Sequence, residues 1–204
     1  MHKVLATLLI CTALSCQAAR AATPQNETAV FAGGCFWGIE AVFEHLRGVT
    51  RAVAGYSGGA KETAHYEMVS SGTTGHAESV QVTFDPKVVS YRELLRVFFT
   101  VAHDPTQLNR QGPDDGTQYR SAIFYATPEQ KADAEAFIRD LTARRTFRGP
   151  IVTQVVALRA FYPAEDYHQH FVRDNPYNPY VATFDLPKLA DLRAKFPQLV
   201  VSAR

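Results

Sequence analysis

The order of hydrophobic patterns along the first two thirds of the chain restricts it to few folds. Alternating or continuous apolar runs indicate strands, and apolar residues three and four apart indicate helices. These patterns predict strands at 28–32, 49–56, 80–84 and 121–125, and helices at 35–47 and 90–101. The order β-α-β-β-α-β is the split βαβ, or ferredoxin-like, arrangement, in which two helices cover one face of a mixed sheet. We therefore predict an α+β two-layer sandwich.

The last third of the chain adds further elements to this core. Thr127 and Pro128 are typical of a helix start, and the pattern predicts a helix at 128–144. A β-like run follows at 151–158, and two more helices are expected at 164–172 and 187–196.

Two polar segments, 60–77 and 103–118, are longer than ordinary connections. Segments of that length are usually functional or disordered.

The first residues have the composition of an export signal. Lys3 precedes an apolar stretch at 4–14, and small residues flank Arg20 as at a signal-peptidase site. We predict that residues 1–21 are a signal peptide and that 22–204 is a single domain, periplasmic or secreted.

Two alternatives concern the same segment. An uncleaved helical anchor is one, but the apolar stretch is short for a membrane span. Lipid attachment at Cys16 is the other, although Leu14 stands at the wrong position for a lipoprotein site.

Charge and hydropathy exclude two broad classes of partner. The net charge of +1 provides no broad basic surface for nucleic acid. Beyond the predicted signal, no apolar run is long enough to span a membrane. A 204-residue chain that is 46% hydrophobic suits one domain with a substantial core.

Cys35 is the only cysteine outside the predicted signal, which contains Cys11 and Cys16. A single thiol in an exported protein suggests reactivity. Cys35 also follows two glycines and opens a helix, where the dipole and free N–H groups are expected to lower a thiol pKa. The alternative is a buried, inert cysteine.

The neighbours of Cys35 and one strand residue are further candidates. Phe36 and Trp37 are adjacent aromatics that either line an apolar slot beside the thiol or pack in the core. Glu78 has the parity of Val80, so its side chain should face inward. A carboxyl in partly apolar surroundings has a raised pKa and can donate a proton. The alternative is a strand-end glutamate that reaches solvent.

The remaining polar candidates are weaker when taken singly. Tyr56, Tyr66 and Tyr119 combine a hydroxyl with an apolar ring, and Asp114 lies on the second long polar segment. Three histidines invite a metal or a Cys/His hydrolase interpretation: His103, His168 and His170. Their spacing does not suit a zinc site with Cys35, so we predict no metal and interpret them as structural.

Six motifs occur together and in order, and this combination is similar to one known family. They are GGCFWG at 33–38, GYSGG at 55–59, GHAE at 75–78, HDPT at 103–106, GTQYRS at 116–121 and AEDYHQ at 164–169. The chain resembles the A-type peptide methionine sulfoxide reductases, which act on the S epimer, over roughly residues 28–180.

The resemblance implies a role for each matching residue. Cys35 matches the nucleophile, Glu78 the carboxylic acid that protonates the sulfoxide oxygen, and Tyr66 and Tyr119 the phenols that hold that oxygen. Three further residues complete the implied site: Phe36 and Trp37 as the methyl pocket, and Asp114 as a supporting aspartate. The family needs no cofactor and no metal, and we expect a monomer that repairs oxidised proteins or free methionine sulfoxide.

The C-terminal tail departs from many members of that family. They carry a resolving cysteine there, whereas this tail has none, and Tyr180 falls near the expected position. Phe171 stands where many members have tyrosine. The chain therefore resembles the single-cysteine branch, and we expect an external thiol, thioredoxin-like or small, to reduce its sulfenic acid.

Two other functions are compatible with parts of the sequence. A Cys/His acyl-transfer hydrolase would need a histidine within hydrogen-bond reach of Cys35. A binding module would capture oxidised peptides without turnover.

Overall fold

The computed structural model describes residues 26–201, and the predicted signal with Cys11 and Cys16 lies outside them. The strands are β1 (Glu27–Gly33), β2 (Val49–Ser57), β3 (Ala77–Phe84), β4 (Arg110–Gln111), β5 (Asp114–Asp115), β6 (Ser121–Tyr125), β7 (Gln154–Ala157) and β8 (Phe161–Pro163). The α-helices are α1 (Phe36–Glu44), α2 (Tyr66–Val69), α3 (Tyr91–Val97), α4 (Pro128–Ala143), α5 (Phe171–Asp174) and α6 (Leu186–Lys195). Short 3₁₀ turns are η1 (Lys61–Thr63), η3 (Thr117–Tyr119) and η4 (Asp166–His168), and π-helical turns are η2 (Phe98–Ala102) and η5 (Val181–Asp185).

The central sheet has the order expected for a split βαβ core. Its strands run β7-β6-β1-β3-β2-β8, and only the β6–β7 pair is parallel. Of the four central strands, β6-β1-β3-β2, the inner two are β1 and β3. Helix α1 connects β1 to the outer strand β2, and α3 lies in the connection from β3 to the outer strand β6. The predicted α+β fold with a mixed sheet is confirmed.

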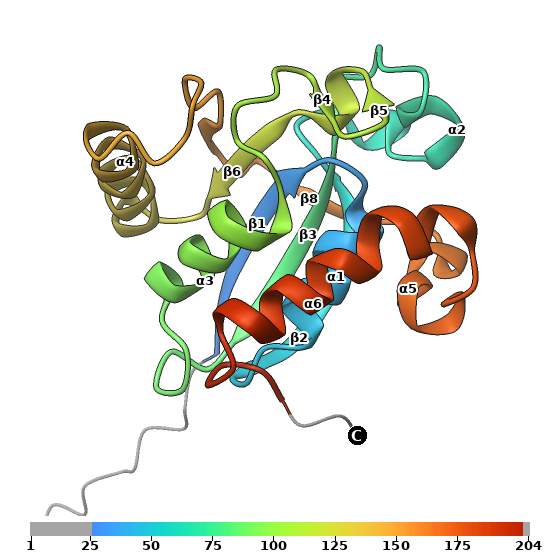
Figure 1. Cartoon of the computed structure of the whole chain (residues 1–204). Coiled ribbons are helices and arrows are strands. Elements are labelled where there is room, and N and C mark those ends of the chain that lie inside the picture. Colours follow the sequence, from blue (N-terminus) through green and yellow to red (C-terminus); the bar gives the residue numbers. More distant parts are fainter. Residues whose placement is uncertain (1–25, 202–204) are drawn as a thin grey trace, which may run out of the picture.

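The main core lies between the sheet and the helices drawn in front of it in Figure 1. Successive strand residues point to opposite faces, so Phe31 joins the helices while Val30 and Ala32 face the other way. Phe31 stacks on Phe43 of α1 and on Phe98 beyond α3, with ring centroids 5.1 and 4.9 Å apart respectively. A smaller apolar cluster that includes Val30 and Ala32 covers the back of the sheet.

Two of the expected helices begin with caps that the sequence predicts. Ser90 and Glu93 form a reciprocal capping box at the start of α3. The Thr127 side chain accepts a hydrogen bond from the Gln130 N–H at the start of α4, which has Pro128 in its first turn.

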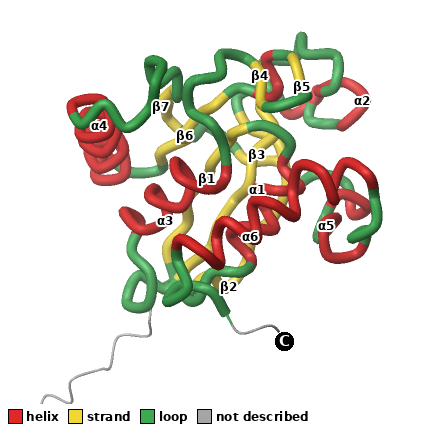
Figure 2. The backbone as a smooth tube through the Cα atoms, viewed as in Figure 1, coloured by secondary structure: helices red, strands yellow, loops and turns green. Residues whose placement is uncertain are grey.

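The two long polar segments are built of short elements that Figure 2 shows clustered at one end of the sheet. Segment 60–77 contains η1 and α2, and segment 103–118 contains the β4–β5 hairpin and η3. Both segments therefore hold a defined shape.

The expected helix at 164–172 and the long β-like run at 151–158 are wrong in detail. His170 has a positive φ of 55° and separates η4 from α5. The Gln169 side chain is the reason, because its amide oxygen and nitrogen bond the N–H and C=O of Ala54 on β2, at 3.0 Å each. Only Gln154–Ala157 of the run is strand, and β8 was not predicted.

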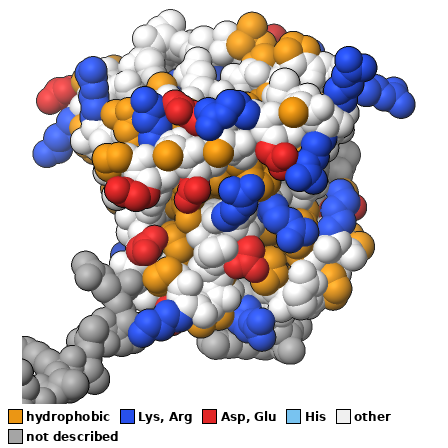
Figure 3. All heavy atoms as spheres, turned by 90° about the vertical axis from the view of Figure 1, so that its left-hand side faces the viewer, with side chains coloured by type: hydrophobic (Ala, Val, Ile, Leu, Met, Phe, Trp, Pro, Cys, Tyr) orange, Lys and Arg blue, Asp and Glu red, His pale blue; other side chains and the backbone are white. Residues whose placement is uncertain are grey.

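The surface shown in Figure 3, on the side of α4, mixes both signs of charge. Lys and Arg side chains alternate with Asp and Glu and with isolated apolar groups. On this face, the described residues form no broad basic patch. None of the helices within 26–201 combines the length and apolar character needed to cross a bilayer.

Gly38 on α1 lets the C-terminal segment approach closely. A Cβ at this position would lie 2.2 Å from Asp185 Oδ1 and 2.7 Å from Lys188 Nζ. Asp185 is fully buried and pairs with Lys188 at 3.2 Å. The missing side chain therefore seats η5 and α6 against α1.

We predict that Gly38→Ala lowers the free energy of unfolding by about 1–3 kcal/mol, since Asp185 or Lys188 must move to admit the methyl group. Helix propensity alone predicts the opposite sign, a gain of up to about 1 kcal/mol. Urea denaturation distinguishes the two. Gly149→Ala is the milder comparison, because the nearest atom to its Cβ would be 3.3 Å away and needs to move by only a few tenths of an ångström. An increase in stability for Gly38→Ala would refute this packing.

Candidate active site

Cys35 occupies the turn between β1 and α1. Gly34 has a φ of 105°, and Gln111 packs so closely that a Cβ on Gly34 would lie 2.5 Å from it. This left-handed glycine turns the chain from the end of β1 so that Cys35 becomes the N-cap residue of α1. The predicted place of the thiol at a helix N-terminus is confirmed.

Glu78 lies beside this helix start. It is the second residue of β3, it is 2% exposed, and its Oε2 accepts a hydrogen bond of 3.0 Å from the Phe36 N–H. The inward orientation predicted from strand parity is confirmed. Burial raises the pKa of Glu78 to about 8, although the Phe36 N–H opposes the shift. The carboxyl is therefore mostly protonated at neutral pH.

A pocket of about 170 Å³ opens at this point. Its lining residues are Cys35, Phe36, Trp37, Tyr66, Glu78, Asp114, Tyr119 and Tyr180. The structure thus brings all seven predicted site residues to one cavity and adds Tyr180. A cavity of roughly 150 Å³ holds a benzene molecule, so this pocket fits the end of one side chain.

A larger hollow of about 490 Å³ lies elsewhere, between β1 and the start of α4. It is lined by Glu27, Glu129 and Asp133 among others, and it contains no thiol. The chemistry therefore belongs to the smaller pocket.

The aromatic wall of the pocket is held by contacts within it. The Trp37 ring stacks on Phe171 with centroids 3.7 Å apart, and its Nε1–H donates to His168 Nδ1 at 3.1 Å. The Tyr180 ring meets Trp37 edge-on at 5.8 Å. Phe36 is buried and tilts against Tyr56 and His168. The two adjacent aromatics therefore have different surroundings yet share one pocket.

Two phenols reach the pocket from the two polar segments. Tyr66 is the first residue of α2 and Tyr119 the last of η3. Burial raises the pKa of both phenols, so they are neutral donors. Among the hydrogen bonds of residues 26–201, neither hydroxyl has a partner, which leaves both free to bind an oxygen atom in the pocket.

Glu165 positions one of these phenols and was not predicted as a site residue. Its Oε1 accepts the Tyr66 N–H at 2.9 Å, and its Oε2 accepts the Tyr56 hydroxyl at 2.8 Å. It thereby ties α2 to β2.

Asp114 and Tyr180 form a hydrogen-bonded pair in the pocket lining. The Tyr180 hydroxyl donates to Asp114 Oδ2. Burial raises the pKa of Asp114, while the hydrogen bond from Tyr180 opposes the shift. Within the pocket lining there are three tyrosines and two carboxyls and no histidine, which excludes the Cys/His hydrolase geometry.

The three histidines lie outside the pocket lining and form hydrogen bonds with other parts of the chain. His103 is buried between the Phe98 C=O and the Ser121 hydroxyl, at 2.9 and 2.7 Å, and burial lowers its pKa to about 4. His168 accepts the Trp37 N–H, and His170 bonds Glu44.

The chain is similar to known proteins of one family. Residues 27–199 match the family model described as peptide methionine sulfoxide reductase. The chain belongs to the peptide methionine sulfoxide reductase family. It is 55% identical to peptide methionine sulfoxide reductase MsrA 2 of Mesorhizobium japonicum over 178 residues, which cover 87% of this chain and 91% of the relative. It is 58% identical to MsrA 2 of a Synechocystis species over 171 residues, 84% of this chain and 80% of the relative.

Solved structures share the fold of this reductase. Reduced Mxr1 from Saccharomyces cerevisiae matches with a TM-score of 0.70 and 33% identity over 75% of this chain and 87% of the yeast chain. Methionine sulfoxide reductase A of Corynebacterium diphtheriae matches with a TM-score of 0.67 and 37% identity over 78% and 80% of the two chains.

The expected lowering of the Cys35 pKa is wrong for the reductase without substrate. Burial raises the pKa of the thiol well above its ordinary value, and the carboxyls of Glu78 and Asp185 raise it further. The Trp37 N–H and the Lys188 ammonium act in the opposite direction but are outweighed. The helix terminus is present as predicted, but the dense surroundings of the sulfur dominate.

The raised pKa of Glu78 makes the stability of this reductase depend on pH. The folded protein holds this proton up to about pH 8, whereas the unfolded chain releases it near 4.5. The stability that the neutral carboxyl provides is therefore complete below pH 4.5 and is lost as pH rises through about 8.

We predict that Glu78→Gln loses less stability than the wild-type protein as pH rises, because the amide stays neutral and still accepts the Phe36 N–H. Urea denaturation at pH 5 and pH 8.5, run on both proteins, gives the two differences in free energy of unfolding. Glu40, whose pKa burial also raises to about 8, contributes equally to both proteins. An identical pH dependence in the variant would contradict the raised pKa of Glu78.

Proposed function

We propose that this reductase acts on the S epimer of methionine sulfoxide, free or in proteins, and that Cys35 takes up the oxygen as a sulfenic acid. Membership of this family supports reduction of methionine sulfoxide and repair of oxidised proteins as the general activity. The role of each residue is supported by the convergence of a thiol, a protonated carboxyl and two phenols on one pocket. The epimer rests on the resemblance of the sequence motifs to the A-type reductases.

The first step is activation of the sulfoxide. The Tyr66 and Tyr119 hydroxyls donate to the sulfoxide oxygen, and Glu78 delivers a proton to it. Glu78 suits this step because its raised pKa keeps the proton available at neutral pH. The methyl group lies against Phe36 and Trp37, where apolar surface is buried.

The second step transfers the oxygen. The Cys35 sulfur attacks the sulfoxide sulfur and forms an S–S bond. The S–O bond breaks as the hydroxyl moves to Cys35, and cleavage of the S–S bond releases methionine as a thioether. The thiol proton passes to Glu78 and replaces the proton that went to oxygen. The sulfoxide is reduced by two electrons and Cys35 is oxidised to a sulfenic acid, so no metal or dinucleotide is required. Asp114 supports the pocket by accepting the Tyr180 hydroxyl.

We predict that the full-length chain with dithiothreitol consumes only the S epimer of a methionine sulfoxide peptide. Cys35→Ser should abolish turnover, and Glu78→Gln should slow it by about 10²–10⁴-fold, the usual contribution of a general acid. Chiral chromatography of both epimers over time measures this. No turnover by the wild-type chain, or turnover that survives Cys35→Ser, would disprove the proposed function. Release of one methionine per chain under every reductant would instead favour a binding module.

Recycling is proposed to come from outside the protein. Cys35 is the only cysteine of residues 22–204, and Tyr180 rather than a thiol stands beside the pocket. One external thiol attacks the sulfenic acid and releases water, and a second reduces the resulting mixed disulfide. A thioredoxin-like protein or a small thiol can supply both. We also propose export, with residues 1–21 removed as a signal peptide.

Intact-mass spectrometry after one turnover without reductant should show one added oxygen, on Cys35. The mass of the unreacted exported protein is the control, and it also gives the mature N-terminus, expected at Ala22. A loss of two hydrogens, which marks an intramolecular disulfide, would refute external recycling and would require retention of Cys11 or Cys16.

A further inference from the structure

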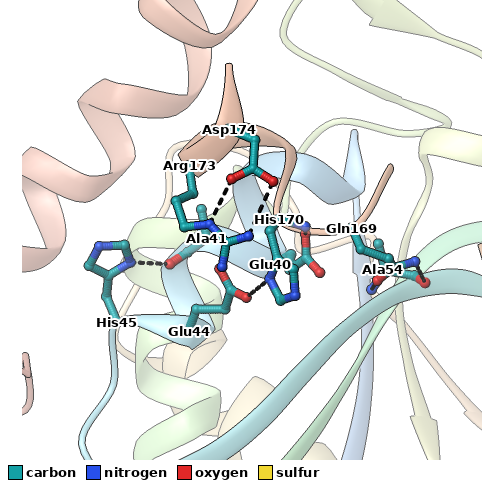
Figure 4. Close-up of polar contacts among 9 residues, drawn as sticks. All are labelled: Glu40, Ala41, Glu44, His45, Ala54, Gln169, His170, Arg173 and Asp174. Atoms are coloured by element: carbon teal, nitrogen blue, oxygen red, sulfur yellow. Dashed lines mark hydrogen bonds and ion pairs between the residues drawn. The ribbon is translucent and has the colours of Figure 1, made fainter. Parts of the chain in front are cut away.

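A second polar cluster lies on α1, beyond the end that carries Cys35. Glu40 and Glu44 are one helical turn apart and so share a face, and His170 approaches them from the segment before α5 (Figure 4). One potential ligand atom from each of the three side chains lies within 4.8 Å of the other two. Neither the proposed reaction nor the pocket uses these residues.

Glu40 is incompletely bonded in this cluster. It is 1% exposed, and its Oε2 accepts the His170 N–H at 2.8 Å. Its Oε1 is buried without a hydrogen-bond partner among the described residues. A buried carboxylate oxygen without a partner is costly. The Glu44 carboxyl, close to it on the same helix face, adds repulsion.

His170 completes the set with a nitrogen ligand. Its Nδ1 bonds Glu44 Oε1, and both side chains are partly exposed, which gives solvent ions a path to the cluster. Its left-handed backbone, with φ 55°, turns the ring toward α1. The Arg173 guanidinium attracts the Glu40 carboxyl electrostatically but forms its two hydrogen bonds, of 2.7 and 3.1 Å, with Asp174.

From this geometry we infer that Glu40, Glu44 and His170 bind a divalent transition-metal ion such as zinc. One imidazole and two carboxylates are a ligand set that zinc accepts, at about 2.0–2.2 Å per bond, with water in the remaining position. The ion takes the place of the hydrogen bond between His170 and Glu44 and satisfies Glu40 Oε1.

The ion would act as a clamp between α1 and the segment before α5. That segment carries His168, which accepts the Trp37 N–H, and it leads into Phe171, which stacks on Trp37. A metal at His170 therefore fastens one wall of the substrate pocket to the helix that bears Cys35. Trp37 is the only tryptophan in the chain, so its fluorescence reports on this contact.

The test uses the full chain with Cys11, Cys16 and Cys35 all changed to Ser, so that no thiol binds the ion. The readouts are metal binding and fluorescence and do not involve turnover, so the result is independent of the proposed function. Titration with zinc chloride, followed by calorimetry and by Trp37 fluorescence, should give one ion per chain, a fluorescence change that saturates with it, and a rising melting temperature.

His170→Gln and Glu44→Gln in the same background should each weaken zinc binding at least tenfold. His45→Gln is the matched control, since His45 lies at the end of α1 and its ring bonds the Ala41 C=O rather than the cluster. It should bind zinc like its parent. Absence of stoichiometric binding, or equal affinity in His170→Gln and His45→Gln, would overturn the inference. If His170→Gln does not fold, Glu44→Gln alone tests the zinc site. It should fold, because Glu44 is partly exposed and glutamine has nearly the same volume.

Discussion

The hydrogen bond from the Phe36 N–H to the Glu78 carboxyl is the contact on which the rest of the site depends. It joins the N-terminus of α1 to the middle of the sheet, and it places the thiol and the acid on the same pocket. A helix N-terminus offers unsatisfied N–H groups, and a buried carboxyl needs them. The site therefore follows from a local requirement of the fold, met by one glutamate on β3.

The same arrangement concentrates groups that are unfavourable to bury. Glu78, Asp185 and the Cys35 thiol lie close together, and each carboxyl raises the pKa of the thiol. Low polarity favours the neutral forms of the Glu78 carboxyl and the Cys35 thiol, so the resting site holds these two protons. An approaching sulfoxide is the first group that can accept one of them. The resting site therefore contains a protonated Glu78 and a neutral Cys35 thiol rather than a preformed thiolate.

Much of the fold was predictable because its signals are local. The alternation of Val80, Val82 and Phe84 fixed the face of β3 and hence the orientation of Glu78, and the caps of α3 and α4 are set by residues within four positions of each other. The motifs then brought seven pocket residues together. The pKa of Cys35 was not predictable, because it depends on how tightly Glu78 and Asp185 pack around the sulfur. Tyr180 was missed as a pocket residue, since its partner Asp114 is 66 positions away. The helix expected at 164–172 failed for a similar reason, since Gln169 bonds a strand 115 positions away.

That last contact has a consequence for how the molecule meets other proteins. On β2, the backbone groups of Ala54 are occupied by the Gln169 amide and by the Ala164 N–H, and the neighbouring β8 is only three residues long. An unpaired, regular strand edge invites another chain to add a strand, and short or side-chain-blocked edges prevent this. A repair enzyme works among oxidised, partly unfolded clients that expose such strands. On the β2 side of the sheet, the bonds to Ala54 leave no free backbone group at this position for such a strand to pair with.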